Sequence, residues 1–427
     1  MADLLLFGRD PEGRAIPLES QYRLGRLAGA LADAGHHVDV LLPLSESEIG
    51  PQAWAPAHLL PPDTVADESF FLRYAVVIVS LELYPYDLRF PVPLVVNLQG
   101  PLFAVGLPPA EQMDALDGYW FSRRLAQATD ALRRGDFFIC SGERQRLFSL
   151  GMLGAVGRIN NLTVADAERL IGIVSPGVIH RPEQTGPRPG PDGRRPALLW
   201  MSGVYPWYEP LAALEGFRLA ALESPDMRLI FAGAANPTAE GLCRENLVRL
   251  HESVREHGLE NKVSFLPWRP LSALNEVYAD VCAAICLYRP SIETQVSWRG
   301  RVVELLGAGL PVILTGGDDI AEMVRAYNAG LVLGSNDPAV VATAIQTMLT
   351  DTGRRARMAD NVRRLVVERL DWRKNIACLD SFCRAPDFAR DQRNPALQKN
   401  MRLHLPIRTL SALPQRLYLK YQIWRQR

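Results

Sequence analysis

The sequence lacks a long uninterrupted apolar run, an excess of charge of either sign, and the cysteine density of a secreted disulfide scaffold. No stretch reaches ~18 consecutive apolar residues, about what a membrane-spanning helix needs. Six cysteines in 427 residues are sparse, and the first residues lack the basic leader of a signal peptide. Lys+Arg and Asp+Glu both number 47, so no overall field attracts nucleic acid. We therefore expect a cytoplasmic protein with no nucleic-acid partner.

Two phosphate-binding motifs are also missing. No Walker-type glycine-rich loop is present, and no G-x-G-x-x-G string follows the first apolar run. Both absences argue against phosphoryl transfer and against binding of a nicotinamide cofactor. The composition, 48% hydrophobic and 22% charged, is nevertheless that of a globular protein with a large buried core.

Short apolar runs alternate along the chain with longer segments of helical periodicity. The runs are continuous rather than alternating, as is typical of parallel strands that are covered on both faces. They span 4–7, 37–43, 75–80, 93–98, 136–141 and 170–175, then 197–203, 227–233, 262–267, 281–288, 311–317 and 330–335. This rhythm predicts an α/β fold made of two successive Rossmann-like halves.

The domain boundaries follow from composition. Prolines, glycines and charges crowd the segment from 181 to 196, which predicts a linker. We therefore expect an N-terminal domain over 1–180 and a second domain over 197–370, the latter closed by helices at 338–350 and 354–370. A further closing helix is predicted over 371–391.

The last segment, 392–427, differs from the rest because it carries eight Lys/Arg and no acid. Its apolar residues Leu413, Leu417, Tyr421 and Trp424 recur at helical spacing. Such a basic amphipathic segment suits peripheral contact with an anionic membrane surface. A terminal helix that docks on the first domain is the alternative.

The segment 287–315 holds the strongest candidate binding site. A predicted strand ends near Tyr288, and a helix is predicted to begin near Gly300. Free backbone N–H groups at a helix start, together with nearby arginines, favour a diphosphate. Arg299 and Arg301 flank that start, and Glu304 lies one turn inside, where a carboxylate can accept hydrogen bonds from ribose hydroxyls. An ordinary surface ion-pair cluster is the alternative.

The string that includes Glu304 and continues through GAGLPVI resembles family 4 glycosyltransferases of the GT-B fold. The resemblance implies two facing Rossmann-like domains with a cleft between them, a nucleotide-diphosphate sugar as co-substrate, and transfer with retained configuration. Glu304 matches the glutamate that holds the donor ribose. The family's first glutamate has no match at the regular spacing, because Val296 stands there and Glu293 lies three residues earlier. The resemblance also implies no bound metal, although Asp318 and Asp319 form an acidic pair.

A bacterial subset linked to cell-surface polysaccharides is more similar still. Its arginine-rich string before the helix reads Trp298-Arg299-Gly300-Arg301 here, and its strand and turn read DFFICSGERQRL over 136–147. Many family members carry an arginine and a lysine after the strand at 197–203, but this chain has an aromatic loop instead. We infer that Arg299 and Arg301 supply the positive charge, with Glu293 beside them as a third catalytic candidate.

Other donor-side candidates follow neighbouring strands. Gly203 allows the backbone to approach a phosphate or a sugar, and Trp207 either stacks on a ligand ring or packs on its own domain. Trp268 and Arg269 resemble the strand end that meets the base, although a structural turn is the alternative. Gly300 begins the helix.

The acceptor-side candidates follow strands of the first half: Gly8, Arg9, Gln99, Gly100 and Glu143. Ligands bind α/β sheets at the carboxyl ends of the strands, so we expect these residues to shape an acceptor pocket. The predicted function is sugar transfer to a hydroxyl of a carbohydrate or lipid-linked acceptor, in polysaccharide or glycoconjugate biosynthesis. The alternatives are a GT-B nucleotide-sugar epimerase and a non-catalytic two-lobed sugar-binding protein.

Overall fold

The computed structural model describes residues 1–8, 18–42, 56–61, 63–64, 66–85, 87–99, 115–178, 196–235, 240–269 and 271–394. The chain divides into two compact units. The first comprises Met1–Cys140, Arg146–Gly172 and Leu379–Arg427, and the second comprises Ser141–Gln145 and Ile173–Cys378. None of the described helices is long and apolar enough to cross a bilayer.

The first unit is built on a seven-stranded sheet in the order β3-β2-β1-β4-β5-β6-β7. Its strands are β1 (Asp3–Phe7), β2 (His37–Leu41), β3 (His58–Leu59), β4 (Val76–Ser80), β5 (Leu94–Asn97), β6 (Phe137–Cys140) and β7 (Ile171–Ile173). Its helices are α1 (Leu18–Asp33), α2 (Glu68–Phe71), α3 (Ala115–Arg134), α4 (Glu143–Ala155) and α14 (Ala377–Arg384), of which α4 and α14 begin in the second unit. The strands from β1 to β6 pair in parallel.

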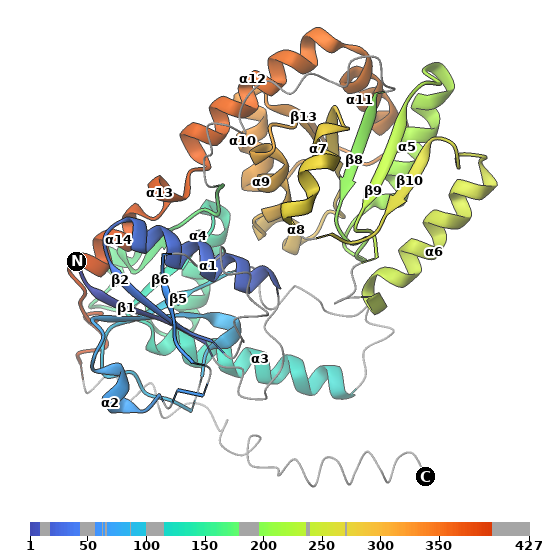
Figure 1. The fold of residues 1–427 in the computed structure, drawn as a ribbon. Coiled ribbons are helices and arrows are strands. Elements are labelled where there is room, and N and C mark those ends of the chain that lie inside the picture. The colour runs from blue at the N-terminus through green and yellow to red at the C-terminus, as the bar shows by residue number, and fades with distance from the viewer. Residues whose placement is uncertain are drawn as a thin grey trace, which may run out of the picture. The chain divides into compact units, whose positions relative to one another are not determined.

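The second unit is built on a six-stranded parallel sheet in the order β10-β9-β8-β11-β12-β13. Its strands are β8 (Ala197–Met201), β9 (Arg228–Ala232), β10 (Val263–Leu266), β11 (Ala283–Cys286), β12 (Val312–Thr315) and β13 (Gly330–Leu333). Its helices are α5 (Pro210–Glu223), α6 (Glu240–Glu256), α7 (Asn275–Ala279), α8 (Ile292–Val296), α9 (Gly300–Gly307), α10 (Asp319–Tyr327), α11 (Pro338–Thr350), α12 (Thr352–Arg369) and α13 (Trp372–Asn375). Figure 1 shows β8, β9 and β10 side by side.

The predicted α/β fold is confirmed, since each of the twelve apolar runs contains a strand. The strand order reverses at β8, which has β9 on one side and β11 on the other. The carboxyl ends of β8 and β11 are therefore a topological switch point, the place where open α/β sheets bind ligands.

The boundaries differ from the prediction in two ways. The division between the units falls at Gly172/Ile173 rather than at 180, and the predicted linker lies outside the described residues. The closing helix predicted over 371–391 is wrong, because the chain forms the short helices α13 and α14 and leaves helical structure after Arg384. Residues 379–394, which we call the return segment, belong to the first unit.

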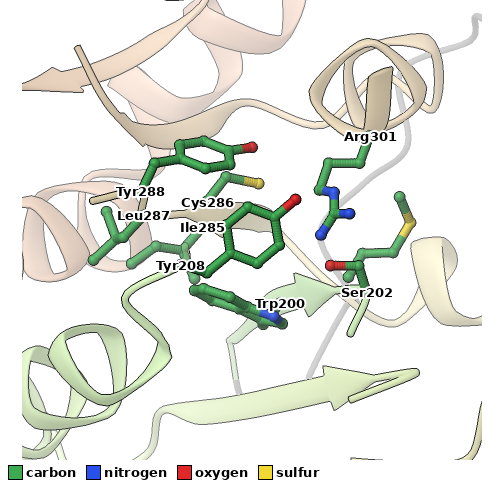
Figure 2. A pocket seen from close by; sticks show the side chains of 9 residues that line it. Trp200, Ser202, Tyr208, Ile285, Cys286, Leu287, Tyr288 and Arg301 are labelled. Atoms are coloured by element: carbon green, nitrogen blue, oxygen red, sulfur yellow. The ribbon is translucent and has the colours of Figure 1, made fainter. Parts of the chain in front are cut away.

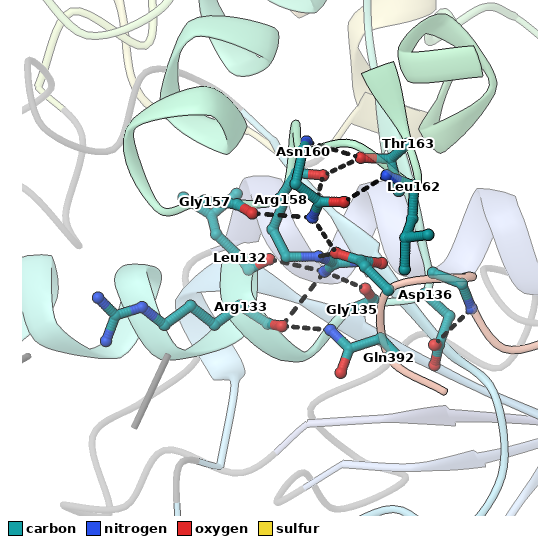
Figure 3. Close-up of polar contacts among 12 residues, drawn as sticks. Leu132, Arg133, Gly135, Asp136, Gly157, Arg158, Asn160, Leu162, Thr163 and Gln392 are labelled. Atoms are coloured by element: carbon teal, nitrogen blue, oxygen red, sulfur yellow. Dashed lines mark hydrogen bonds and ion pairs between the residues drawn. The ribbon is translucent and has the colours of Figure 1, made fainter. Parts of the chain in front are cut away.

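This return segment is held by buried polar contacts (Figure 3). Arg158 donates from Nε to Asp391 at 2.6 Å, and both side chains are almost completely buried. Its Nη1 donates to the carbonyl of Leu132, which lies in the last turn of α3 and has no partner inside the helix, and to the carbonyl of Gly135, just after the helix. Asp136 accepts from the backbone N–H groups of Leu94 and Ala389, both at 2.9 Å. The ion pair and the carboxylate together fix the return segment to the sheet.

Asp136 provides a pH-dependent test of this attachment. Burial raises the pKa of Asp136 to about 6, against the opposing effect of its two N–H donors. The native state therefore binds more protons than the unfolded chain between about pH 4 and pH 6, so the contribution of Asp136 to stability is lost as pH rises through that window. We expect the unfolding free energy of the wild type, relative to Asp136→Asn, to fall by up to about 3 kcal/mol between pH 4 and pH 7.

Urea unfolding of both proteins across this pH range measures the difference. Asp387→Asn is the matched control, because Asp387 lies on the same return segment and is exposed, as is its ion-pair partner Arg393. Its difference from the wild type should not depend on pH in this window. A difference for Asp136→Asn that is constant, or that grows with pH, would contradict the assignment.

Candidate functional site

The loops after β8 and β11 are joined at the switch point. The backbone N–H of Glu209 donates to the carbonyl of Leu287, and that of Arg289 donates to the carbonyl of Trp207, both at 3.0 Å. Tyr208 and Tyr288 form the antiparallel bridge between these two bonds. The aromatic loop that follows β8 is therefore fixed against the chain at the end of β11.

Five aromatic side chains form a cluster with Tyr208 at its centre. The rings of Tyr205 and Trp207 stack with centroids 4.9 Å apart. Tyr208 lies edge-on to Tyr288 at 5.0 Å and to Trp200 at 6.1 Å. Such edge-to-face contacts add to the apolar burial of the rings. We refer to Trp200, Tyr205, Trp207, Tyr208 and Tyr288 as the aromatic cluster.

Helix α9 places two polar side chains beside the aromatic cluster. Its buried residues Val302, Val303, Leu305 and Leu306 pack into the core. Arg301 and Glu304 are three positions apart and only partly buried, so they share the other face of the helix. Gly300 is the first residue of α9, and no neighbouring atom lies where its side chain would be. The predicted helix start is thus in place, with an arginine and a glutamate on its polar face.

Arg299 lies beside this helix start, but carboxylates already balance its charge. Its Nη1 lies 3.3 Å from Glu293, and its Nε lies 3.3 Å from Asp318, which is fully buried. Burial raises the pKa of Asp318, and the Arg299 guanidinium opposes that rise. Asp318 also accepts from Ala321 N as the N-cap of α10. Arg299 therefore connects α8 to α10, and this geometry differs from the free phosphate-binding charge that the sequence suggested.

Among the described residues, no carboxylate balances the charge of Arg301. Its guanidinium lies 4.5 Å from the ring centre of Tyr208 and 5.8 Å from that of Tyr205, and it forms no ion pair with a carboxylate among the described residues. Figure 2 shows the guanidinium on the same side as the hydroxyl groups of Tyr208 and Tyr288. A cation without an acidic partner, held at a strand end, is suited to binding an anion.

A small pocket opens beside Arg301, with about 160 Å³ of empty space that includes open solvent at its mouth. Trp200, Ser202, Tyr208, Cys286 and Tyr288 are among its lining residues. Trp200 Nε1 and the Tyr288 hydroxyl are buried and have no hydrogen-bond partner among the described residues. Burial raises the pKa of Cys286 to about 11, so this thiol is not a nucleophile at neutral pH. The pocket therefore offers hydrogen-bond donors to a small group, and it is too small for a whole nucleotide sugar.

The other donor-side candidates occupy the ends of neighbouring strands. Gly203 is favoured by packing, since a Cβ there would lie 2.9 Å from the Tyr205 ring. Trp207 packs on Tyr205, the second of the two alternatives left open by the sequence. Trp268 is 41% exposed beside Gly233, and Arg269 is half-buried. Trp268 thus has a free surface for a ligand, whereas Trp207 is used within the aromatic cluster.

The acceptor-side candidates fall at strand ends where they are described. Gly8 follows β1, and a Cβ at that position would lie 2.8 Å from Leu83. Gln99 follows β5, and its buried Oε1 has no partner among the described residues. Glu143 is exposed at the start of α4, in the turn that groups with the second unit. Arg9 and Gly100 lie outside the described residues.

Asp319 contacts that turn. Arg144 N donates to Asp319 Oδ2 at 3.1 Å, and the Arg144 guanidinium lies 3.5 Å from the other oxygen. Asp318 is occupied by Arg299 and Ala321, so the adjacent acids serve separate local contacts. In the part of the chain that the structure describes, no group of three His, Cys, Asp or Glu residues has the arrangement of a metal site.

Sequence reasoning missed three residues of this site. Trp200 and Tyr288 look like ordinary strand residues, and Asp318 is 19 positions away from its partner Arg299. Their position within three residues of a strand end was the available signal. Which of them meet in space depends on the strand order, and periodicity does not reveal that order.

The comparisons with known proteins agree with this architecture. Residues 188–365 match the family described as glycosyl transferases group 1. Two D-inositol 3-phosphate glycosyltransferases are similar to part of the chain. That of Corynebacterium kroppenstedtii is 31% identical over 140 residues, and that of Rhodococcus jostii is 27% identical over 217 residues. These matches cover 32% and 49% of this chain but only 29% and 45% of the relatives, so the chain matches less than half the length of either.

Solved structures are similar over nearly the whole chain. Anabaena HepE in complex with UDP-glucose has a TM-score of 0.61 at 16% identity, covering 90% of this chain and 99% of that one. A Rickettsia africae glycosyltransferase has a TM-score of 0.60 at 14% identity, with coverage of 90% and 99%. At such identities the similarity establishes the fold. Residues 188–365 are therefore similar to the glycosyl transferases group 1 family, on a chain that has the GT-B fold.

Proposed function

We propose that the chain is a glycosyltransferase that moves a sugar from a nucleoside-diphosphate sugar to an acceptor hydroxyl. The single observation that carries this proposal is Arg301, a cation without a carboxylate partner among the described residues, at the β8–β11 switch point. The family match over 188–365 and the UDP-glucose bound by Anabaena HepE support a nucleotide-sugar donor. A uridine nucleotide is the first donor to test.

The chemistry requires stabilisation of the leaving group. As the bond between the anomeric carbon and the phosphate oxygen breaks, negative charge develops on the diphosphate. Arg301 and the N-terminus of α9 provide positive potential there before the reaction begins, so little reorganisation is needed. The acceptor oxygen forms the new bond to the anomeric carbon. In a retaining reaction, the leaving phosphate takes the acceptor proton, and no side-chain base is required.

The remaining donor contacts follow from position. Glu304, one turn along α9 from the helix start, is suited to the ribose hydroxyls, and Trp268 with Arg269 is suited to the base. Trp200 Nε1 and the Tyr288 hydroxyl offer hydrogen bonds to a phosphoryl oxygen. Arg299 and Glu293 act indirectly, by fixing the loop that precedes α9.

The acceptor-side candidates are Gln99, which follows β5 in the first unit, and Glu143, which begins α4 in the turn that groups with the second unit. A carbohydrate or lipid-linked hydroxyl compound of a polysaccharide or glycoconjugate pathway fits this proposal. Peripheral membrane contact through 392–427 stays a prediction, since residues 395–427 lie outside the described part of the chain.

Nucleotide screening followed by a release assay tests the proposed function. We expect UDP, GDP or ADP to raise the melting temperature of the chain, because a ligand that binds only the native state stabilises it. The matching nucleotide sugar should then release its nucleoside diphosphate faster when an acceptor is present. Isomerised donor without transfer would indicate an epimerase. Sugar binding without any nucleotide binding would indicate a non-catalytic binding protein.

A further inference from the structure

Arg299 and Arg301 contact the same aromatic cluster but differ in how their charge is balanced. Arg299 lies 4.1 Å above the centre of the Tyr288 ring and also pairs with Glu293 and Asp318. Arg301 lies 4.5 Å above the centre of the Tyr208 ring and pairs with no carboxylate among the described residues. In both cases a guanidinium lies over a tyrosine ring. Carboxylates neutralise the charge of Arg299, which makes it a structural cation, whereas the charge of Arg301 is available to bind an anion.

Tyr208 is held rigidly enough to support a guanidinium. It is 6% exposed, and the backbone bonds of Glu209 and Arg289 fix it on both sides. Tyr288, Tyr205 and Trp207 all contact its ring edge-on. The ring face therefore has one orientation, and Arg301 lies over it.

An aromatic face holds a cation without cancelling its charge. The ring quadrupole attracts a guanidinium, and the attraction grows when both groups are shielded from water. A carboxylate at the same place would compete with an incoming phosphate for the same donors. Arginine is suited to this arrangement because its planar head can stack on a ring and still direct N–H groups outward.

We propose that Tyr208 is a positioning residue for Arg301, whose ring face holds the guanidinium toward the pocket so that it can bind the diphosphate of the donor. The inference rests on the proposed function. The loop after β8 then has an indirect role in phosphate binding. It contributes the Tyr208 ring, whereas the cation, Arg301, belongs to α9.

A double-mutant cycle tests the assignment. The affinity for UDP, or for the nucleoside diphosphate that the wild type binds best, is measured by calorimetry for the wild type, Tyr208→Leu, Arg301→Met and the double variant. We expect Tyr208→Leu to weaken binding roughly 10- to 30-fold, the range of a desolvated cation–π contact. Tyr208→Leu should cause little further loss in the Arg301→Met background, because the residue acts through Arg301.

Tyr208→Phe is the conservative variant that separates positioning from folding. It keeps the ring face and should retain affinity within about threefold of the wild type. Losses that multiply in the double variant would overturn the inference, as would equal loss in Tyr208→Phe and Tyr208→Leu, since the hydroxyl would then be the active group. Failure of the wild type to bind any nucleoside diphosphate would instead contradict the proposed function itself.

Discussion

Arg301→Met is expected to lower the rate of nucleoside-diphosphate release by about 100- to 1,000-fold, the loss seen when one preorganised donor to a developing negative charge is removed. Methionine fills similar space next to Tyr208 but carries no charge. Arg301 has no carboxylate partner among the described residues, so no buried charge is left behind. Folding stability should therefore change little. Initial rates at saturating donor, with urea unfolding of the same samples, measure both quantities.

Arg325→Met provides the matched control for this variant. Arg325 lies in the same unit on α10, is half exposed, and pairs with Glu322 one turn away. Exposed pairs of this kind contribute little to stability, and this one is not part of the candidate site. Its rate should equal that of the wild type. An Arg301→Met rate within about threefold of the wild type would remove Arg301 from the proposed phosphate role.

Arg299→Met is expected to lower the unfolding free energy by about 3–5 kcal/mol, because removing one partner of a buried ion pair leaves uncompensated charge. Asp318 is fully buried, and the Glu293 side chain is 14% exposed. Without Arg299 the pKa of Asp318 should rise further, because the cation that opposes the effect of burial is gone. Urea unfolding of the variant against the wild type measures the loss, with Arg325→Met again as control.

The two arginine variants separate the two roles. Arg301→Met should lose turnover and keep stability, whereas Arg299→Met should lose stability first. If Arg299→Met were as stable as the wild type yet nearly inactive, Arg299 would contact the phosphate directly. That result would support the direct phosphate-binding role predicted for Arg299 from the sequence.

Much of the fold was predictable because its signal is local. Parallel strands that are covered on both faces read as continuous apolar runs, and each such run contains a strand. The two-residue strand β3 was missed, since His58 and Leu59 carry no apolar run. The return of the chain to the first unit was also missed, because the pairing of Arg158 with Asp391 joins residues far apart in the sequence.

The site was predictable in its location and less so in its detail. The helix start after β11 and the glutamate one turn inside α9 follow from spacing. The different states of Arg299 and Arg301 do not, because they depend on Asp318 and Tyr208, which strand order brings to the same sheet edge. Arg299 and Arg301 are two residues apart, so their sequence context is nearly the same. Their side chains nevertheless have different neighbours in the folded chain.

A structure of the chain with a bound nucleoside diphosphate would show directly whether Arg301 binds the phosphates. We expect a phosphate oxygen within hydrogen-bond distance of the Arg301 guanidinium, at the carboxyl ends of β8 and β11, with Arg299 still paired to Glu293 and Asp318. A nucleotide whose phosphates lie away from Arg301 would contradict it.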